Sequence, residues 1–402
     1  MNQANGAGAL AGFKVVDLSR VFGGPLCTQL LGDHGADVIK VEPPQGDETR
    51  TWGPPERDGE TAYYTGINRN KRSIGLDLST DKGRGILLRM LEDADLLIEN
   101  FRIGTMDRWG MGYDDVIAQR FPRLIYCRIS GFGADGPLGK MPGYDGVAQA
   151  LSGLMSLNGS PVSGPVRVGV AVVDQAAGMN AAIAILAAAY ERERSGRGQF
   201  IEATLYDSGV ALIHPQIANW FMSQETPQIT GNSHANVAPY DRYETSTAPV
   251  FVAALNNGQF RRLCAKLGLA ELAEDEQFTT NADRVVNREA LDERLKPLFA
   301  MVDGKTFYLD LLEHGVPAAA INDVPTVLGH PHTRHREMVI DREDYQGYGI
   351  VAKLGRTPGS IRRSPPHFSA DGRDILGELG YGADEIDSLL AEGVFFEERR
   401  DV

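Results

Sequence analysis

Residues 13–44 read FKVVDLSRVFGGPLCTQLLGDHGADVIKVEPP and contain a strand, a turn, a helix and a second strand in succession. The β-branched run at 13–18 is typical of a buried strand, and residues 36–41 repeat that character before two prolines end it. Between them, residues 26–32 have the length and the closing glycine of a short helix. A strand–helix–strand unit of this length predicts two parallel neighbouring strands.

Later segments continue this alternation. Residues 80–93 have helical spacing, and residues 94–99 and 124–129 are short apolar runs typical of strands. Strands that alternate with helices predict an α/β fold with a Rossmann-like, doubly wound parallel sheet. A long helix is predicted within 168–194, where residues 179–190 are nearly all Ala, Ile and Leu. We expect that helix to be buried on most sides.

The composition changes twice along the chain. Residues 226–239 are rich in Thr, Asn, Gly and Pro, and residues 330–370 are polar with several prolines. Such segments are typical of loops and domain boundaries. We therefore predict a large α/β domain with a linker helix over 1–224, a smaller α+β domain over 225–329, and a linker and C-terminal segment over 330–402 that returns to the large domain.

The chain has 402 residues, and its composition is close to that of an average soluble globular protein. Its formal net charge of −14 argues against nucleic acid or an anionic membrane as the main partner. Three widely spaced cysteines form neither a disulfide framework nor a zinc motif, which fits a reducing compartment. The first residues lack the basic and apolar regions of a secretory signal. We therefore expect a cytoplasmic protein that acts on small molecules.

Several common catalytic motifs are absent from the sequence. It contains no G-x-S-x-G elbow, no H-E-x-x-H pair and no G-x-G-x-x-G after the first strand, where residues 23–25 read Gly-Gly-Pro. A nicotinamide dehydrogenase is therefore poorly supported. Three histidines within 330–335 could bind a metal, but the proline and arginine among them indicate a polar surface loop. We predict no metal site.

Asp174 ends an apolar run and enters the long apolar helix. An aspartate in this place is often an ordinary helix N-cap, and that alternative stays open on the bare sequence. The functional alternative is a carboxylate that helix N–H groups and the helix dipole hold ionised. Because an ionised, partly desolvated carboxylate can attack an activated acyl group, Asp174 is the candidate nucleophile.

Two further segments contain side chains suited to an adenine nucleotide. Residues 68–73 form a basic turn in an acidic protein, which is either a solvated loop or a phosphate grip through Lys71 and Arg72. Residues 99–102, Glu-Asn-Phe-Arg, follow a predicted strand. Open α/β sheets bind ligands at the ends of their parallel strands, so this amide, ring and guanidinium are candidates for hydrogen bonding, stacking and phosphate binding.

These segments belong to a longer series that carries a resemblance. The series comprises Val16 to Ser19 with Gly24 and Pro25, Leu31 to Glu42, Asn68 to Asp77, Glu99 to Arg102, Asp107 and Arg108, Ile129 to Gly133, Gly143 to Asp145, and Gly196 to Gln199. In this order and spacing the chain resembles the family III CoA-transferases, the CaiB/BaiF family, over residues 10–395. That family includes formyl-CoA transferase and α-methylacyl-CoA racemase.

The resemblance implies a covalent role for Asp174, because family members place their catalytic aspartate between such an apolar run and the helix. Asp174 would attack a donor thioester to give an aspartyl anhydride and CoA thiolate, and the thiolate would then form an aspartyl-CoA thioester. The acceptor acid would displace CoA through a second anhydride. The implied reaction moves CoA from an acyl-CoA to a free carboxylic acid, with coenzyme A and its thioesters as substrates and no permanently bound cofactor.

The resemblance and the basic segments together suggest binding positions and an assembly. The expected contacts of coenzyme A are Val21, Phe22, Gly23, Arg72, Leu76, Asn100, Phe101, Arg102, Arg108, Tyr144 and Asp145. A mobile substrate loop over the aspartate is expected at Gly231, Asn232, His234 and Asn236. Such a loop would keep water from hydrolysing the anhydrides. Family members form interlocked homodimers, so the resemblance implies a homodimer here, and the polar linkers are long enough for interlocking.

Three alternatives remain beside a transferase for longer dicarboxylates. The racemase branch uses a His–Asp pair in a Gly-His-Asp element, whereas residues 143–145 are Gly-Tyr-Asp, and a tyrosine with a pKa of about 10 replaces an imidazole poorly. Formyl-CoA and oxalate chemistry is disfavoured because Phe22 stands where that branch has glutamine. A CoA-ester-binding protein without turnover is the third alternative. We expect succinate, glutarate, malate or a methyl-branched acid, with Arg242 or His234 pairing its distal carboxylate.

Overall fold

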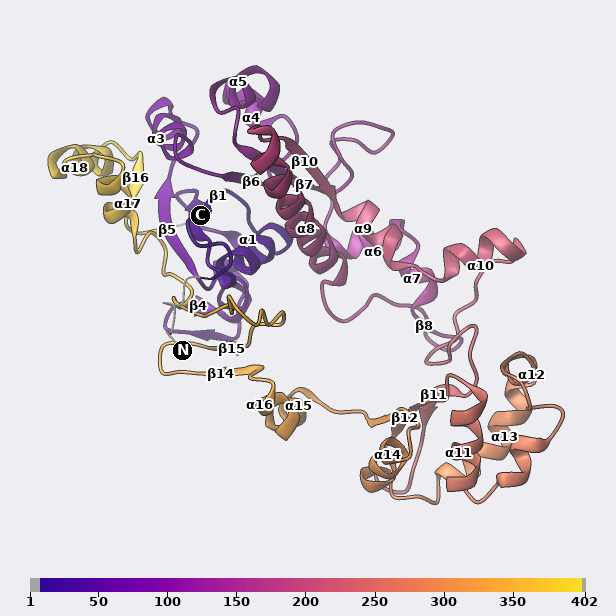
Figure 1. Cartoon of the computed structure of the whole chain (residues 1–402). Helices are drawn as coiled ribbons and strands as arrows, with labels where there is room; N and C mark the ends of the chain where they lie inside the picture. Colours follow the sequence, from indigo (N-terminus) through magenta and orange to yellow (C-terminus); the bar gives the residue numbers. More distant parts are fainter. Residues whose placement is uncertain (1–7, 400–402) are drawn as a thin grey trace. The chain divides into compact units, whose positions relative to one another are not determined.

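The structure is a computed structural model, and it describes residues 8–399. Contacts along the chain divide it into two compact units (Figure 1). The first unit contains the chain up to residue 154 together with 168–217 and the part from 335 onward, and the second contains 155–167 and 218–334. The segment 155–167 thus belongs to the second unit, whereas the sequence division places it in the large domain.

Within residues 8–399, the largest sheet has seven strands in the order β10-β7-β6-β1-β2-β5-β16. The strands are β1 (Lys14–Asp17), β2 (Asp37–Glu42), β5 (Lys71–Leu76), β6 (Leu96–Glu99), β7 (Ile125–Ser130), β10 (Phe200–Thr204) and β16 (Phe395–Phe396). All neighbours pair parallel except β16, which pairs antiparallel with β5. The largely parallel α/β sheet predicted from the sequence is confirmed.

β5 differs from the prediction, which made residues 68–73 a basic turn. The turn ends at Asn70, and β5 begins at Lys71, which lies opposite Val38 of β2. The pairing with β2 extends this basic segment into the sheet, because a strand between two neighbours satisfies its backbone hydrogen bonds on both sides. Lys71 and Arg72 are therefore strand residues rather than loop residues.

The chain order reverses at β1. From β1 the chain adds β2 and β5 on one side and then returns to place β6, β7 and β10 on the other. Val15 of β1 accordingly lies opposite Val38 of β2 and Leu96 of β6. At such a reversal the connections after neighbouring strands leave in opposite directions, and a crevice opens outside the carboxyl ends of the strands.

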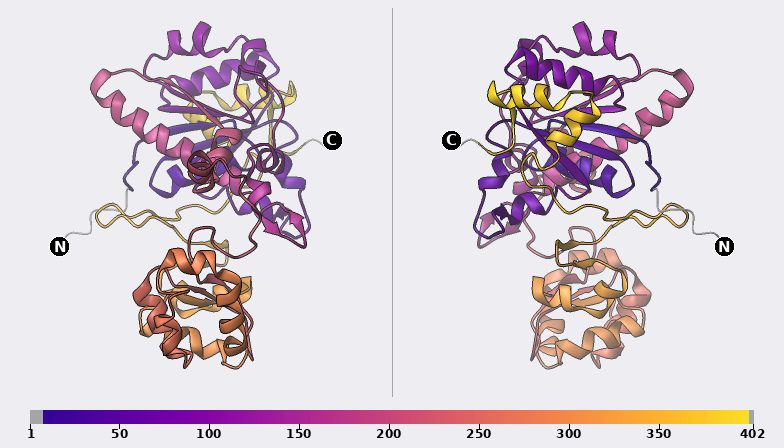
Figure 2. Two further views of the ribbon diagram at one scale, coloured as in Figure 1. Left: turned by 90° about the vertical axis from the view of Figure 1, so that its right-hand side faces the viewer. Right: turned by 90° about the vertical axis from the view of Figure 1, so that its left-hand side faces the viewer.

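Helices cover both faces of this sheet (Figure 2). They are α1 (Gly23–Asp33) and α8 (Val172–Ser195) on one face, and α3 (Asp81–Leu91), α17 (Gly372–Glu378) and α18 (Ala383–Ala391) on the other. Leu31 and Ile185 pack with Val15 in one core, while Leu87 packs with Val16 in the other. Fully burying such a side chain contributes about 1.5–3 kcal/mol, and two covered faces explain why the strands read as continuous apolar runs.

The remaining elements of the first unit are short. They are η1 (Glu48–Thr51), β3 (Glu56–Arg57), β4 (Glu60–Thr61), α2 (Ala62–Thr65), α4 (Thr105–Arg108), η2 (Tyr113–Ile117), α5 (Ala118–Arg120), α6 (Asp145–Leu151), α9 (Leu205–Leu212), α16 (Pro331–His335, which crosses the unit boundary), β14 (Val339–Asp341) and β15 (Gln346–Tyr348). Two further helices, α7 (Leu154–Leu157) and α10 (Gln216–Ser223), also cross boundaries between the units. Of these elements, η1, α6 and α9 bear on the site described below.

The second unit has its own antiparallel sheet in the order β11-β12-β13 and its own apolar core. Its elements are β8 (Gly159–Ser160), β9 (Gly164–Pro165), β11 (Tyr240–Tyr243), β12 (Val250–Ala253), α11 (Asn257–Lys266), η3 (Ala270–Glu274), α12 (Asn281–Val286), α13 (Arg288–Phe299), α14 (Gly304–Glu313), β13 (Ala318–Ala320) and α15 (Val324–Gly329). In its core the rings of Tyr243 and Phe299 stack at 4.2 Å between centroids. This unit has the α+β character expected from the sequence.

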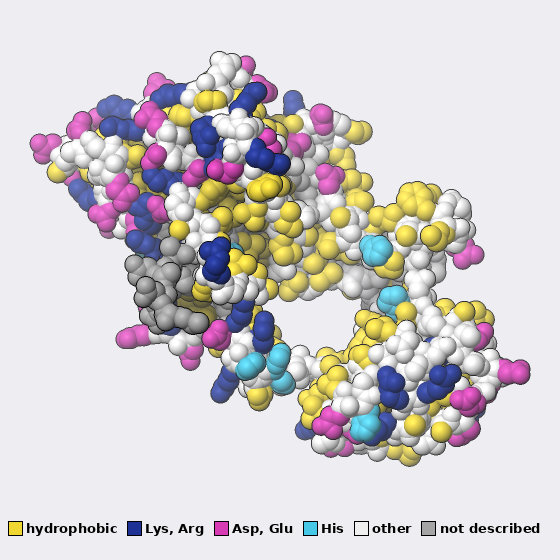
Figure 3. Space-filling model, in the orientation of Figure 1, with side chains coloured by type: hydrophobic (Ala, Val, Ile, Leu, Met, Phe, Trp, Pro, Cys, Tyr) yellow, Lys and Arg dark blue, Asp and Glu magenta, His cyan; other side chains and the backbone are white. Residues whose placement is uncertain are grey.

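The long helix α8 is less buried than its composition suggested. Ala181 and Ile185 face the core, but Ile183 is 67% and Tyr190 69% exposed, and hydrophobic side chains gather over this part of the first unit (Figure 3). Among the described residues α8 is the one helix long and apolar enough to cross a membrane, and 39% of its most apolar window is buried in the protein. The expectation of burial on most sides is wrong, because one face of the helix is enough to cover the sheet.

Candidate active site

A cavity of about 410 Å³ lies where the sheet reverses, within the first unit. Its walls are the segments after β1, β6 and β7, the residues 140–144, and the first turns of α8 and α9. The lining residues are Arg20, Val21, Phe22, Gly23, Glu48, Asn100, Phe101, Arg102, Ile103, Ile129, Ser130, Gly131, Lys140, Met141, Pro142, Gly143, Tyr144, Asp174 and Leu205. Small-molecule sites commonly occupy about 300–1,000 Å³, so the cavity has a suitable size.

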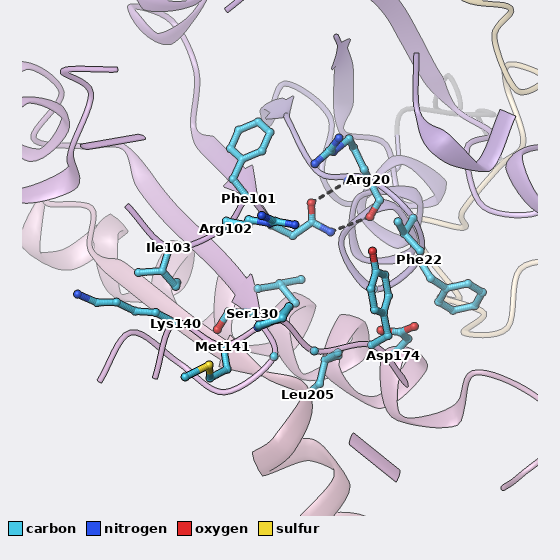
Figure 4. A pocket seen from close by; sticks show the side chains of 18 of the residues that line it. Arg20, Phe22, Phe101, Arg102, Ile103, Ser130, Lys140, Met141, Asp174 and Leu205 are labelled. Carbon is cyan, nitrogen blue, oxygen red and sulfur yellow. Dashed lines mark hydrogen bonds between the residues drawn. The ribbon is translucent and has the colours of Figure 1, made fainter. Parts of the chain in front are cut away.

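Asp174 lies at one side of this cavity, beside Phe22, and Lys140 and Ile103 lie at the opposite side (Figure 4). It is the third residue of α8, and the N-cap of that helix is Ala171. The N-cap alternative for Asp174 is therefore wrong. Among the residues the structure describes, no donor or cation binds the Asp174 carboxylate, so its oxygens are available to a reactant.

Asp145 takes the capping role instead. One of its carboxylate oxygens, Oδ1, accepts from the backbone N–H of Val173 at 2.8 Å and from that of Asp174 at 3.2 Å. The other, Oδ2, accepts from the amide of Gln149 at 2.6 Å. Asp145 begins α6, so the contact ties the starts of two helices together behind Asp174. Because a residue outside α8 caps this helix, the side chain of Asp174 is not needed to cap it.

Burial, together with the smaller effect of the nearby charge of Asp145, raises the pKa of Asp174 to about 7. The expectation that the helix N-terminus holds Asp174 ionised is therefore wrong at acidic pH. Desolvation disfavours the charged carboxylate more than the helix start favours it. Such a carboxylate is more basic than an ordinary aspartate, and a more basic oxygen is a better nucleophile once it is deprotonated.

The starts of α1 and α8 approach each other closely beside Asp174. A β-carbon on Gly178 would lie 2.5 Å from the carbonyl oxygen of Gly23, and one on Gly23 would lie 3.3 Å from that of Asp174. A glycine is therefore required at position 178, where these helices cross, and position 23 leaves little room for a side chain. The preceding residue Val21 has a φ of 70°, a left-handed conformation that costs a β-branched side chain about 1–3 kcal/mol.

Cations and an aromatic ring line the rest of the cavity. The Arg20 guanidinium lies 5.7 Å from the centre of the Phe101 ring, and its Nε has no hydrogen-bond partner within residues 8–399. Arg102 and Lys140 are exposed, and neither pairs with a carboxylate among the described side chains. Arg20 itself lies 3.9 Å from Glu48, a carboxylate that also lines the cavity. The site thus combines a free carboxylate at one side with two unpaired cations, Arg102 and Lys140, that suit an anionic ligand.

The family comparison agrees with this chemistry. The family described as CoA-transferase family III matches residues 10–372. The chain belongs to CoA-transferase family III. This family III chain is 38% identical over 397 residues to the succinyl-CoA:glutarate CoA-transferase of Homo sapiens, covering 96% of this chain and 89% of that protein. The resemblance drawn from the sequence motifs is confirmed, and the protein is a CoA-transferase.

Two further relatives support the assignment of the family III enzyme. The succinyl-CoA:mesaconate CoA-transferase of Haloarcula hispanica is 37% identical over 390 residues, covering 93% of this chain and 97% of that protein. The crystal structure of a CaiB/BaiF family protein from Brucella suis has a TM-score of 0.83 at 39% identity, covering 93% of this chain and 100% of that one. Fold and family thus agree over almost the whole transferase.

The structure brings most of the expected site residues of the transferase together. Val21, Phe22, Gly23, Asn100, Phe101, Arg102, Tyr144 and Asp174 all line the cavity. Asp145 lies behind Asp174 and holds its helix. Their assignment as contacts of coenzyme A remains a prediction, but their convergence from four chain segments is what a binding site requires.

Three expected residues lie away from this cavity. Arg72 pairs with Asp37 and Glu378, both at the surface. Leu76 is fully buried in the apolar core, and Arg108 is exposed and donates to the hydroxyl of Thr105. The first two positions follow from β5, whose side chains point into the sheet's two faces rather than past its end.

The predicted substrate loop belongs to the second unit. Gly231 has a left-handed φ of 67°, and the backbone N–H of Asn236 donates to the ring Nδ1 of His234 at 3.0 Å. Arg242 pairs with Glu244 at 2.5 Å, so its charge is already partly used. The roles of Gly231, Asn232, His234 and Asn236 over Asp174 stay predictions.

Sequence reasoning missed two cations of the cavity, Arg20 and Lys140. Arg20 follows the first strand, so its place after a strand end was a usable signal. Lys140 lies in a glycine-rich segment, and nothing local distinguishes it from a solvated lysine. It also has a left-handed φ of 68°, a conformation that only the structure reveals.

Proposed function

We propose that this enzyme transfers CoA from an acyl-CoA thioester to a free dicarboxylic acid of the succinate and glutarate type, with Asp174 as the nucleophile. The observation that carries the proposal is the carboxylate of Asp174, which faces the cavity without a hydrogen-bonding or charged partner in the described chain. An aspartate with a structural role would cap the helix or form an ion pair, and here Asp145 caps the start of α8. The names of the relatives, which include glutarate and mesaconate transferases, support this substrate class.

The reaction proceeds by exchange at carbonyl carbons. An oxygen of Asp174 attacks the donor thioester carbonyl, the C–S bond breaks, and CoA leaves as a thiolate beside a mixed anhydride. The thiolate attacks the aspartyl carbonyl, which releases the donor acid and forms an aspartyl-CoA thioester. The acceptor carboxylate attacks that carbonyl and expels the thiolate, and the thiolate then attacks the acceptor's own carbonyl in the second anhydride. Acyl-CoA product leaves, and the Asp174 carboxylate is restored.

The cavity suggests the orientation of CoA. Arg20, Arg102 and Lys140 are placed to bind its phosphates by charge-assisted hydrogen bonds, and Phe101 offers a ring for the adenine. Since Lys140 and Asp174 lie on opposite sides of the cavity, CoA would extend from the cations toward the nucleophile. The thioester carbonyl would then meet Asp174 next to Phe22 and Tyr144.

An assembly belongs to this proposal as well. Four side chains on the exposed face of α8, Met179, Ile183, Leu186 and Tyr190, recur at helical spacing and are 43–69% exposed. An apolar stripe of this kind is suited to contact with another subunit. We therefore propose a cytoplasmic homodimer, interlocked through the linkers between the units. Sedimentation of the purified protein would return a single-chain mass if this part is wrong.

The decisive experiment measures transfer and the covalent intermediate together. Succinyl-CoA is offered to a panel of carboxylic acids that includes glutarate, mesaconate, malate, oxalate and formate, and acyl-CoA products are identified by mass spectrometry. We expect exchange with C4–C5 dicarboxylates and trapping of an aspartyl-CoA adduct on the peptide that contains Asp174. Absence of exchange with every dicarboxylate contradicts the proposal.

The same experiment separates the alternatives. Proton exchange at the α-carbon of a methyl-branched acyl-CoA in heavy water, without an acceptor acid, would favour a racemase. Tyr144, which stands where the racemase branch has its histidine, is 57% exposed. Preferred turnover of oxalate or formate would favour that branch of the family instead. Binding of CoA without any adduct or turnover would favour a CoA-ester-binding protein.

A further inference from the structure

Residues 19–22, called the 19–22 turn here, join β1 to α1 and are held by buried side chains almost residue by residue. The Ser19 N–H donates to the carboxylate of Asp17 at 2.9 Å, and the Ser19 carbonyl accepts from the ammonium of Lys40 at 2.8 Å. The Arg20 N–H and carbonyl both bond the side-chain amide of Asn100, at 2.9 and 2.7 Å (Figure 4). The turn thus has little freedom to relax.

The next residue of the turn, Val21, is held by Asp47. The Val21 N–H donates to Asp47 Oδ1 at 3.3 Å. Asp47 is fully buried, and its other oxygen accepts from Lys40 at 2.8 Å. Oδ1 also accepts from the N–H and hydroxyl of Thr49, at 3.0 and 2.8 Å, and so caps η1. One carboxylate therefore joins the turn, the strand β2 and η1.

Val21 is in a conformation that its side chain opposes. Its φ of 70° lies in the left-handed region, which glycine enters freely and β-branched residues avoid. Backbone strain of this kind persists only where the surroundings over-determine it, and it concentrates at functional sites. The peptide group between Arg20 and Val21 is held at both ends, since its carbonyl accepts from Asn100 and its N–H donates to Asp47.

The strained turn forms the wall of the cavity that lies next to Asp174. Val21, Phe22 and Gly23 all line the cavity, and a β-carbon on Gly23 would lie 3.9 Å from the Oδ1 of Asp174. If the backbone at Val21 relaxed to an ordinary φ, the first turn of α1 would change direction relative to Asp174. Reacting groups lose rate steeply when they move by about 1 Å.

We propose that Asp47 is a positioning residue of the transfer reaction: by holding Val21 in the left-handed conformation, it fixes the first turn of α1 against Asp174. Asp47 touches no reactant. This inference rests on the proposed function, since its main effect is read on transfer by Asp174.

The test is a double-mutant cycle of Asp47→Ala and Val21→Gly in the full chain, with kcat measured for succinyl-CoA and the best acceptor acid. Asp47→Ala alone is expected to lower kcat about 100-fold. In the Val21→Gly background, the same change is expected to lower kcat about tenfold or less, because glycine adopts the left-handed conformation without a restraint. Equal losses in both backgrounds overturn the proposal.

A matched control separates positioning from loss of a helix cap. Thr80→Ala removes the side chain that caps α3 in the same unit, away from the cavity. It is expected to change kcat by less than about twofold, as surface substitutions usually do. Urea midpoints of all variants show how much stability each loses. A restoration of kcat by Val21→Gly without a restored midpoint supports positioning, whereas restoration of both together supports a purely structural role and contradicts the proposal.

If Asp47→Ala does not fold, Asp47→Asn is compared in the two backgrounds. Its side-chain amide no longer neutralises the Lys40 ammonium, so it weakens the contact that holds Val21. If the wild-type protein transfers no CoA, the proposed function fails. The positioning role of Asp47 is then tested by the dissociation constants for CoA. Asp47→Ala should then weaken CoA binding more in the wild-type background than in the Val21→Gly background, and equal weakening overturns it.

Discussion

Two sets of charged side chains surround the cavity, and they differ in burial and in pairing. Beneath the 19–22 turn, Lys40 and Asp47 are fully buried and lie 2.8 Å apart. At the cavity itself, Arg102 and Lys140 are exposed and pair with no carboxylate in the part of the chain that is described. Removing one partner from a buried pair leaves an uncompensated charge, whereas an exposed cation costs little and stays available to a ligand.

This difference separates the buried pair of Lys40 and Asp47, which supports the structure of the site, from the exposed Arg102 and Lys140, which can bind a ligand. Burial alone would raise the pKa of Asp47, but the Lys40 ammonium and the hydrogen bonds from Thr49 hold that pKa below its ordinary value. Asp174 is the exception within this comparison, since it is largely buried like the first set and unpaired like the second. A group that is desolvated and yet unpaired is poised for reaction rather than for stability.

The largest effect is expected at this exception. Asp174→Asn keeps the size of the side chain but removes the nucleophilic oxygen, and we expect kcat to fall on the order of 10⁴-fold. The trapped aspartyl-CoA adduct should disappear with the activity, while CoA still binds within a few-fold. Residual transfer within about tenfold of wild type would show that another group carries the acyl chain.

The next effect tests the buried set. Lys40→Met leaves Asp47 buried without its ion-pair partner, and we expect the free energy of unfolding to fall by about 3–5 kcal/mol. Lys82→Met is the matched control, because Lys82 pairs with Glu392 at the exposed surface, and it should cost less than about 1 kcal/mol. Urea denaturation followed by circular dichroism measures both. Equal losses of unfolding free energy in the two variants would show that the buried ion pair does not stabilise the protein more than an exposed one.

Loss of the exposed cations of the cavity should affect binding rather than stability. Arg102→Ala and Lys140→Ala each remove an exposed cation that pairs with no carboxylate within residues 8–399, so stability should stay within about 0.5 kcal/mol of wild type. The KM for acyl-CoA should rise about tenfold for each, with a smaller change in kcat, because a charge-assisted hydrogen bond to phosphate is lost. Arg108→Ala, which removes an exposed arginine outside the cavity, is the control. An unchanged KM in both cavity variants would place the phosphates elsewhere.

The smallest effect is a shift along the pH axis. Because the pKa of Asp174 is raised to about 7, the deprotonated nucleophile is lost as pH falls below about 7, and the rate of adduct formation should fall with it. Asp145→Asn removes a charge that disfavours the ionised form, so the midpoint should move to lower pH. Asp81→Asn, at an exposed helix start, should leave it in place.

The same raised pKa has a consequence for stability. The folded state favours protonated Asp174, so its contribution to stability is present at low pH and is lost as pH rises from about 4 to about 7. Asp174→Asn should therefore be more stable than wild type at pH 8, by a margin that shrinks toward pH 4. Parallel curves at all pH values would show that burial does not perturb this carboxyl.

Much of the fold could be predicted from local patterns. The apolar runs at 13–18, 36–41 and 94–99 become β1, β2 and β6, because strands that are covered on both faces have an apolar pattern that a short window of sequence shows. β5 could not be predicted in this way, since its basic start resembles a turn. Its pairing with β2 stabilises a strand that its own composition does not favour.

The site was predictable in part for the same reason. Asp174 and residues 100–102 follow recognisable apolar runs, and both reach the cavity. Arg72 was expected there as well, but β5 directs it toward Asp37 and Glu378. Arg20 and Lys140 line the cavity instead. The position of Arg20 after a strand end is a signal in the sequence, but nothing local marks Lys140.

By itself, the sequence determined the fold class, the family and the position of the candidate nucleophile, because these depend on the order of short apolar runs and on motif spacing. Only the tertiary structure decided which cations meet the ligand, that Asp145 rather than Asp174 caps α8, and that the pKa of Asp174 is raised. Those properties come from burial and from contacts between segments far apart along the chain. The energy of a charge depends on the water and partners around it, and no local window of sequence contains that information.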